Sequence, residues 1–298
     1  MNNKLIYQVT GRMMLLFGML LSFAQAQDDF LSALEESAKP EFVSATFKGT
    51  RLVGMPTCET QGKGTLEFRV AHRFGDFSSG GKNFWGLDGG ATIQLSFDYS
   101  LSDRLSIGIG RSSYQKFYDS NVKYKLFQQT TSNKMPVSVT VMAMANFTDQ
   151  VDPGNVIGRP FYRYKINRFS YVHMVMIARK FGERFSFQLS PTHIHYNVVE
   201  KITDKNSILA LGTLSRIKVS KRIAVTGEYI FRLNKYTRDM SNYHNSFSLG
   251  ADIETGGHVF QVYVANSSAL NPAQFIPYTT SNWGKGQVRL GFNISRVF

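Results

Sequence analysis

Hydrophobic and polar residues take alternate positions along much of this chain. In segment 92–99, for example, the apolar residues Ile93, Leu95 and Phe97 are separated by polar ones. Alternation with a period of two places successive side chains on opposite faces of a β-strand. The pattern, or a weaker form of it, is present in segments 65–73, 92–99, 104–110, 121–127, 136–145, 169–180, 184–191, 207–219, 223–232, 246–254, 258–266 and 287–295. It predicts an all-β chain of about twelve strands, although segment 169–180 carries apolar residues on both faces.

The connections between these segments alternate in length. Short turns at 101–104, 181–183, 220–221 and 255–257 alternate with long loops at 74–90, 147–168, 192–206, 234–245 and 267–284, and the links 111–120 and 128–135 are of intermediate length. A closed antiparallel transmembrane β-barrel has this arrangement, with short periplasmic turns and long outer loops. An even number of strands brings both ends of the barrel segment to the side of the short turns.

A soluble β-sandwich is the alternative fold, because its strands alternate in the same way. Two features favour the barrel. The segments run to about nine to twelve residues, near the length that a tilted strand needs to cross a bilayer and above the roughly five or six residues of soluble strands. The last strand also leads to Phe298, although Arg296 interrupts its apolar face. A terminal aromatic residue of this kind resembles the recognition signal of outer-membrane barrels.

The first 26 residues have the features of a secretory signal peptide. Lys4 and Arg12 give a basic start, residues 13–23 form an apolar run too short to span a bilayer as a helix, and Ala24-Gln25-Ala26 fits a cleavage site. A retained anchor helix is the alternative. No later stretch is apolar enough for a transmembrane helix, so a mature chain that crosses a membrane must cross it with strands.

We therefore divide the chain into a signal peptide (1–26), a periplasmic lead-in or plug segment (27–64) and a transmembrane β-barrel (65–298). Residues 27–64 do not alternate, and they could plug the lumen, pack under the barrel or stay mobile; we favour a periplasmic lead-in. Export through a cleaved signal peptide places the barrel in the outer membrane of a bacterium with two membranes.

The chain is strongly basic, with a formal net charge of +13, and the predicted signal peptide contains two of the cations and no acid. Nucleic-acid binding is one explanation of the excess, but export argues against it. A basic pore lining or basic loops near anionic lipid headgroups explain it better. The single cysteine, Cys58, allows no internal disulfide and is expected to be a free structural thiol. No cofactor is expected.

The polar faces of the predicted strands are the candidate functional site. In a closed barrel they point into the lumen, where they either form a closed network of salt bridges and hydrogen bonds or line a selective path for a small solute. The lumen-lining candidates are Glu67, Arg69, Gln94, Asp98, Lys123, Lys125, Gln188, Glu228, Arg232, Asp252, Gln287 and Arg289. Barrels of about eight strands are filled and those of about sixteen are open, so the strand number leaves both alternatives open.

Motifs for metal binding or catalysis are weak. His193 and His195 share a strand face at a spacing that can chelate a metal, but no third ligand is identified, and a polar pair at the barrel rim is the simpler interpretation. The sequence contains no G-x-S-x-G and no H-E-x-x-H motif. An enzyme is therefore not expected, and an outer-membrane hydrolase is the weakest of the hypotheses for function.

Several stretches resemble a family of bacterial outer-membrane proteins that is known as a membrane-bound β-barrel domain of unknown function. They are FKGTRL (47–52), RVAHRFGD (69–76), DRLSIGIGRSS (103–113), IARKF (177–181), DIETGGHVFQ (252–261) and GFNISRVF (291–298). The resemblance covers most of the chain after about residue 45. It implies the barrel and the membrane location, and it implies no activity and no site residues.

Two main hypotheses of function follow. In the first, the protein is a narrow pore or transporter for a small solute. In the second, it is a non-conducting structural or docking barrel that serves an exported partner protein through residues 27–64 or the long loops. The expected partners are outer-membrane lipid, the barrel-assembly machinery through the C-terminal strand, and either the solute or the exported protein; nucleic acid is not expected.

Overall fold

The computed structural model describes residues 40–154, 161–201, 203–238, 240–255 and 258–298. The predicted signal peptide (1–26) and the first part of the predicted lead-in segment (27–39) lie outside the described residues. The chain divides into two units, Met1–Glu41 and Phe42–Phe298, and the second unit contains the barrel. No helix in the described part of the chain is long and apolar enough to cross a membrane.

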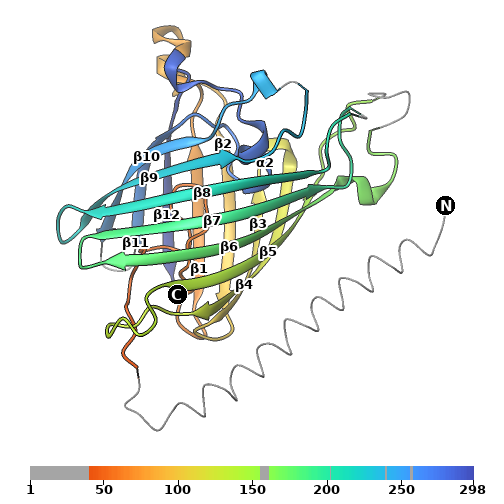
Figure 1. The fold of residues 1–298 in the computed structure, drawn as a ribbon. Helices are drawn as coiled ribbons and strands as arrows, with labels where there is room; N and C mark the ends of the chain where they lie inside the picture. Colours follow the sequence, from red (N-terminus) through yellow and green to blue (C-terminus); the bar gives the residue numbers. More distant parts are fainter. Residues whose placement is uncertain (1–39, 155–160, 202, 239, 256–257) are drawn as a thin grey trace, which may run out of the picture. The chain divides into compact units, whose positions relative to one another are not determined.

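Antiparallel strands form a closed barrel in the second unit (Figure 1). Each strand pairs with its neighbours in the sequence, and β1 closes the barrel by pairing with β12. The strands are β1 (Leu66–Arg73), β2 (Thr92–Ser100), β3 (Leu105–Ser112), β4 (Phe117–Phe127), β5 (Ser138–Thr148), β6 (Phe169–Phe181), β7 (Phe185–Tyr196), β8 (Ser207–Lys218), β9 (Ile223–Arg232), β10 (Phe247–Thr255), β11 (His258–Ala265) and β12 (Arg289–Val297). The all-β, closed antiparallel barrel predicted from the alternation is confirmed.

Short and long connections lie at opposite ends of the barrel. The segments 101–104, 128–137, 182–184 and 219–222 join strands at one end, which we call the short-turn end; β1 begins and β12 ends there. The segments 74–91, 149–168, 197–206, 233–246 and 266–288 join strands at the other end, which we call the long-loop end. The link between β3 and β4 is shorter than expected and also lies at the long-loop end.

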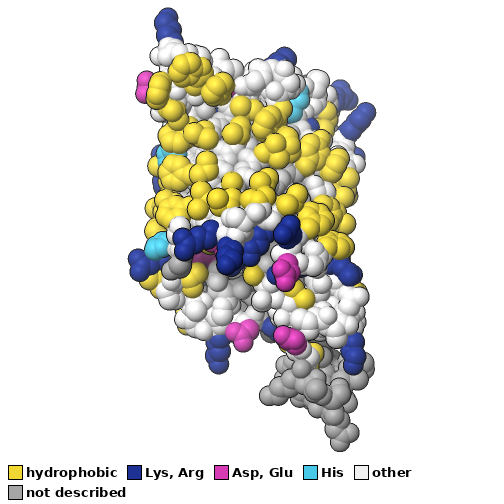
Figure 2. Space-filling view, turned by 90° about the vertical axis from the view of Figure 1, so that its left-hand side faces the viewer, with side chains coloured by type: hydrophobic (Ala, Val, Ile, Leu, Met, Phe, Trp, Pro, Cys, Tyr) yellow, Lys and Arg dark blue, Asp and Glu magenta, His cyan; other side chains and the backbone are white. Residues whose placement is uncertain are grey.

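The outer wall of the barrel is apolar, because the strands point their hydrophobic residues outward. On β2, Ile93, Leu95 and Phe97 are 40–44% exposed, whereas the intervening Gln94 and Ser96 are almost fully buried. Figure 2 shows hydrophobic side chains as a band across one face of the wall, with lysines and arginines gathered along the lower border of the band. This arrangement is the reverse of a soluble protein and is typical of a wall that contacts lipid.

A charge in the middle of this apolar wall is expected to destabilise the inserted barrel. Val175 is exposed on the outer face near the middle of β6. Its replacement by arginine should lower the free energy of unfolding in lipid vesicles by about 2–4 kcal/mol, whereas arginine in place of Phe181, at the end of the same strand, should cost about 0–1 kcal/mol. Unfolding by urea in vesicles measures both variants, and equal losses would argue against lipid contact at Val175.

Some strand ends differ from the prediction. β4 begins at Phe117 instead of residue 121, and β7 continues to Tyr196 instead of ending at residue 191. Pro191 lies within this strand, although a proline has no N–H to donate within a sheet. The residue nevertheless pairs with Leu211 of β8, and the register with β6 is interrupted beside it. The strand therefore passes the proline at a gap in the β6–β7 ladder.

Candidate functional site

The predicted lumen residues lie on the inner face of the barrel, and most of them are buried. Buried members of the set are Glu67, Arg69, Gln94, Asp98, Lys123, Lys125, Gln188, Glu228 and Asp252. Arg232 and Arg289 are partly exposed near the long-loop end. Gln287 precedes β12, and its side-chain Oε1 accepts a hydrogen bond from the Asn282 N–H at 2.9 Å. Gln287 is therefore a loop residue, and its assignment to an inward-facing strand position is wrong.

The inner wall is largely polar along β1 to β4, whereas along β5 to β9 apolar residues are interspersed with polar ones such as Gln188 and Glu228. Inward-facing residues of β5 to β9 form a buried hydrophobic surface that includes Met142, Met144, Met174, Met176, Ile194, Ile208, Leu214 and Ile230. On these strands the lumen is therefore not lined by polar residues alone. The two apolar faces of segment 169–180 have a simple cause, since one face meets lipid and the other packs against chain inside the barrel.

Residues 46–58 fill the lumen as a folded-back segment, which we call the lumen hairpin. Its two arms pair through the N–H of Leu52 to the carbonyl of Met55 and the N–H of Thr57 to the carbonyl of Thr50, at 3.0 and 2.9 Å. The flanking residues are held at the short-turn end, where the N–H of Val43 donates to the Gln129 carbonyl and the N–H of Lys63 to Asp103. The hairpin therefore enters and leaves through the short-turn end.

Two charged side chains of the wall hold the hairpin by its backbone. The carboxylate Oε2 of Glu228 on β9 accepts hydrogen bonds from the N–H groups of Val53, Gly54 and Met55, at 3.3, 3.1 and 3.0 Å. The ammonium group of Lys123 on β4 donates to the carbonyls of Thr50, Thr57 and Glu59, at 3.1–3.2 Å. Hydrogen bonds to ionised groups are about twice as strong as neutral ones, so the wall binds both the tip and the base of the hairpin.

Hydrophobic packing supplements these polar contacts. Phe47, Leu52 and Met55 of the hairpin are buried in the same cluster as the apolar inner surface of β5 to β9. Gln188 of β7 accepts from the N–H of Cys58 and donates to the carbonyl of Pro56. The Cys58 thiol is 1% exposed, and burial raises its pKa well above the ordinary value. It is therefore expected to be unreactive while the hairpin is in place.

A second inserted segment closes the lumen from the long-loop end. It contains the short helix α2 (Pro272–Tyr278), whose residues are buried up to Pro277 and whose N-terminus is capped by Asn271. The side chain of Asn271 also donates to Asp119 of β4 and Asn146 of β5. Inside the barrel the two segments meet, since a Cβ atom on Gly54 would lie 3.0 Å from the ring of Phe275.

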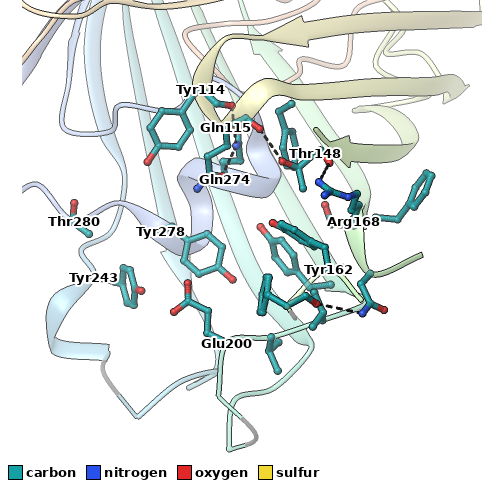
Figure 3. Close-up of a pocket in the computed structure, with 18 residues that line it drawn as sticks. Tyr114, Gln115, Thr148, Tyr162, Arg168, Glu200, Tyr243, Gln274, Tyr278 and Thr280 are labelled. Atoms are coloured by element: carbon teal, nitrogen blue, oxygen red, sulfur yellow. Dashed lines mark hydrogen bonds between the residues drawn. The ribbon is translucent and has the colours of Figure 1, made fainter. Parts of the chain in front are cut away.

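A cavity of about 260 Å³ lies between α2 and the loops at the long-loop end. We call it the outer pocket. Tyrosines 162, 196, 243 and 278 line it together with Arg168, Glu200, Ser170 and Gln274. In Figure 3, the side chain of Glu200 lies next to the ring of Tyr278, while Arg168 lies across the cavity. The pocket therefore combines aromatic rings, hydrogen-bonding groups and one residue of each charge.

The two histidines considered as metal ligands lie on the outer wall. The rings of His193 and His173 stack with centroids 5.7 Å apart, and the ring centroid of His195 lies 6.5 Å from that of His193. Among the described residues, no group of three or more His, Cys, Asp or Glu side chains is placed to hold a metal ion. The Nδ1 atom of His195 lies 3.1 Å from the hydroxyl of Ser207 on β8. This Ser–His contact was not recognised in the sequence, because the two residues come from different strands.

The C-terminal residue takes part in closing the barrel. Phe298 exchanges two backbone hydrogen bonds with Leu66, at 2.9 and 3.1 Å. Its ring is 62% exposed, and the Arg296 guanidinium lies 4.7 Å from the ring centroid. Arg296 therefore stacks on the terminal ring. Recognition of Phe298 by an assembly machinery remains a prediction.

Residues 47–298 match the model of a protein family that is described as a membrane bound beta barrel domain (DUF5777). The chain belongs to this family. The resemblance expected from stretches such as FKGTRL and GFNISRVF is confirmed, and the closed barrel agrees with the description of the membrane bound beta barrel domain. No curated protein matches the chain.

Solved structures with a similar fold are outer-membrane proteins of several kinds. The KdgM porin has 8% identity to this chain, with a TM-score of 0.48 over 78% of this chain and 99% of the porin. An outer membrane channel from Pseudomonas putida F1 has 14% identity and a TM-score of 0.46, over 80% and 97% of the two chains. Outer membrane phospholipase A from Escherichia coli has 9% identity and a TM-score of 0.45, over 78% and 92%. These likenesses do not extend to substrate or activity.

Proposed function

We propose that the protein is an outer-membrane barrel that is closed at rest and that passes a small solute when the lumen hairpin moves. The hairpin obstructs the lumen from the short-turn end and α2 obstructs it from the long-loop end. Charged side chains of the wall hold the hairpin through hydrogen bonds with its backbone: Glu228 accepts from the Met55 N–H, and Lys123 and Arg69 donate to the carbonyls of Thr50 and Val53. Such bonds can be exchanged for bonds to water, so the hairpin can leave without breaking the wall.

One observation favours this proposal over the alternative of a barrel whose lumen is permanently filled. On the polar side of the lumen, several buried atoms of the wall have no hydrogen-bond partner among the described residues, namely Gln94 Oε1, Ser96 Oγ, Asp119 Oδ2 and Asn121 Oδ1. A structural core leaves few polar groups unpaired, because each costs about 1–3 kcal/mol. A wall that alternates between hairpin contacts and contacts with a hydrated solute needs such spare groups.

Recordings from the full-length, refolded protein in planar bilayers test the proposal. The barrel is expected to rest in a closed state and to open in brief steps. A current that is steady from the start would contradict closure at rest. A barrel that stays silent after the hairpin has been removed would contradict a path through the lumen.

The alternative is a non-conducting barrel that docks an exported partner. Within the predicted segment 27–64, residues 46–58 are buried inside the barrel except for the exposed Lys48, so docking by that segment has to rely mainly on residues outside the hairpin. Capture experiments with and without residues 27–45 separate this function from transport. An unchanged set of captured partners argues against docking through this segment.

The hydrolase hypothesis rests on the contact between His195 and Ser207. We expect no serine hydrolase activity, because no carboxylate of the described residues forms an ion pair with the His195 ring, and an orienting partner is part of such sites. A fluorophosphonate probe should label the original protein no faster than it labels the Ser207→Ala variant. Labelling that disappears in this variant would revive the hypothesis.

A further inference from the structure

The outer pocket contains two buried polar atoms that the protein leaves unpaired. Ser170 of β6 and Gln274 of α2 are each 2% exposed, and Ser170 Oγ and Gln274 Oε1 have no hydrogen-bond partner within the described part of the chain. Both residues line the pocket. A hydroxyl group donates and accepts at once, so a ligand that carries several hydroxyls can satisfy both atoms.

The rest of the lining suits the apolar face of such a ligand. Tyr162, Tyr196 and Tyr278 present aromatic rings around the cavity. Burial raises the pKa of Tyr278, so its hydroxyl stays neutral and can both donate and accept. Rings provide flat contact surfaces and their hydroxyls provide hydrogen bonds, a combination that fits amphipathic ligands.

The charges of the pocket argue against an ionic ligand. The Nη1 atom of Arg168 donates to the carbonyls of Thr148 and Gln150, and its guanidinium lies 4.4 Å from the ring centroid of Tyr162. Glu200 is exposed and forms no ion pair with any described residue. An anion would meet Glu200 and a cation would meet Arg168. A neutral ligand can donate hydrogen bonds to Glu200 and accept them from Arg168 without carrying a net charge.

We propose that the outer pocket binds a small neutral saccharide, of one or two sugar rings. Such a molecule has hydroxyls for Ser170 and Gln274, C–H faces for the tyrosine rings and no charge. The cavity, at about 260 Å³, lies just below the usual size range of ligand pockets, which begins at about 300 Å³, so its ligand has to be small. The proposed binding of a saccharide is argued from the pocket alone, whereas the idea that the saccharide is the transported solute rests on the proposed function.

The pocket also adjoins the obstruction of the lumen. Gln274 and Tyr278 belong to α2, and Phe275 between them contacts the hairpin at Gly54. A ligand in the pocket therefore contacts the helix that supports the tip of the lumen hairpin. If the saccharide is the solute, its binding should increase the reactivity of the Cys58 thiol.

Isothermal titration of the full-length, refolded protein tests the proposal with glucose, galactose, mannose, xylose and maltose as probes. At least one of them should bind with a dissociation constant in the millimolar range or tighter. Ser170→Ala should weaken that binding by about threefold to tenfold, the equivalent of one hydrogen bond, and Glu200→Gln, at an exposed position, should weaken it by a smaller factor. Ser186→Ala, another buried serine of the inner wall, should leave the affinity unchanged.

Three results would overturn the saccharide site. They are no binding of any of these sugars, tighter binding of galacturonate or choline than of every neutral sugar, and equal affinity in the Ser170→Ala and Ser186→Ala variants. Cys58 labelling and bilayer recordings in the presence of the sugar report on transport separately. Sugar binding without any effect on labelling or current would leave the pocket intact and contradict the proposed function.

Discussion

Removal of the lumen hairpin should turn a closed barrel into one that carries a steady current. In the variant, a short glycine–serine link replaces residues 46–58. The link is feasible because the two ends lie together, with the Thr46 N–H donating to the Glu59 carboxylate at 2.8 Å. Without the hairpin, α2 also loses the contact between Phe275 and Gly54, so the obstruction from the long-loop end is weakened as well.

The comparison requires a control that shortens the chain without opening the lumen. Removal of the exposed residues 87–90 at the long-loop end serves this purpose. Both variants should retain a β-sheet circular dichroism spectrum and a migration in gels that depends on heating. Only the hairpin variant should conduct in planar bilayers. If it folds as a barrel but carries no current, the lumen is not a path and the docking function gains support.

Replacement of Glu228 by glutamine should release the hairpin tip without removing side-chain volume. The carboxylate accepts three backbone N–H groups inside the barrel, and the amide retains one neutral acceptor. Hydrogen bonds to a charged group contribute about 1.5–3 kcal/mol. The loss of the charge should therefore raise the open fraction by about tenfold to a hundredfold.

The Cys58 thiol reports this release, because it is the single thiol of the chain and is buried with the hairpin. A maleimide should react with the Glu228→Gln variant faster than with the original protein by the same factor. Asp252→Asn is the matched control, since the buried Asp252 carboxylate binds Arg216 and Gln261 rather than the hairpin. Equal labelling rates in the two variants would show that Glu228 does not hold the hairpin.

The alternation of side chains was sufficient to predict the wall of the barrel, because lipid on one side and polar groups on the other impose a local pattern with a period of two. Residues 46–58 show no such pattern, and their position depends on contacts with residues far away in the sequence, such as Glu228 and Lys123. The pattern of the sequence therefore did not predict the hairpin: a plug was one of three alternatives for residues 27–64, and we favoured a periplasmic lead-in.

A signal for the filled lumen was present nevertheless. Segment 169–180 is apolar on both faces. A strand with lipid on one side and water on the other is expected to be apolar only on the lipid side. Met174 and Met176 pack against the hairpin cluster, so a two-sided strand in a barrel indicates protein inside it. The outer pocket had no comparable signal, because Ser170 and Gln274 come together only through the insertion of α2.

The seam between β1 and β12 has a consequence for biosynthesis. Every other pairing joins strands that are consecutive in the sequence, but this one joins the first strand to the last. Until β12 has been made, β1 exposes an unpaired edge that can recruit another chain. A nonsense mutation anywhere upstream of Arg289 should therefore yield an aggregating, degraded product rather than a smaller working cylinder.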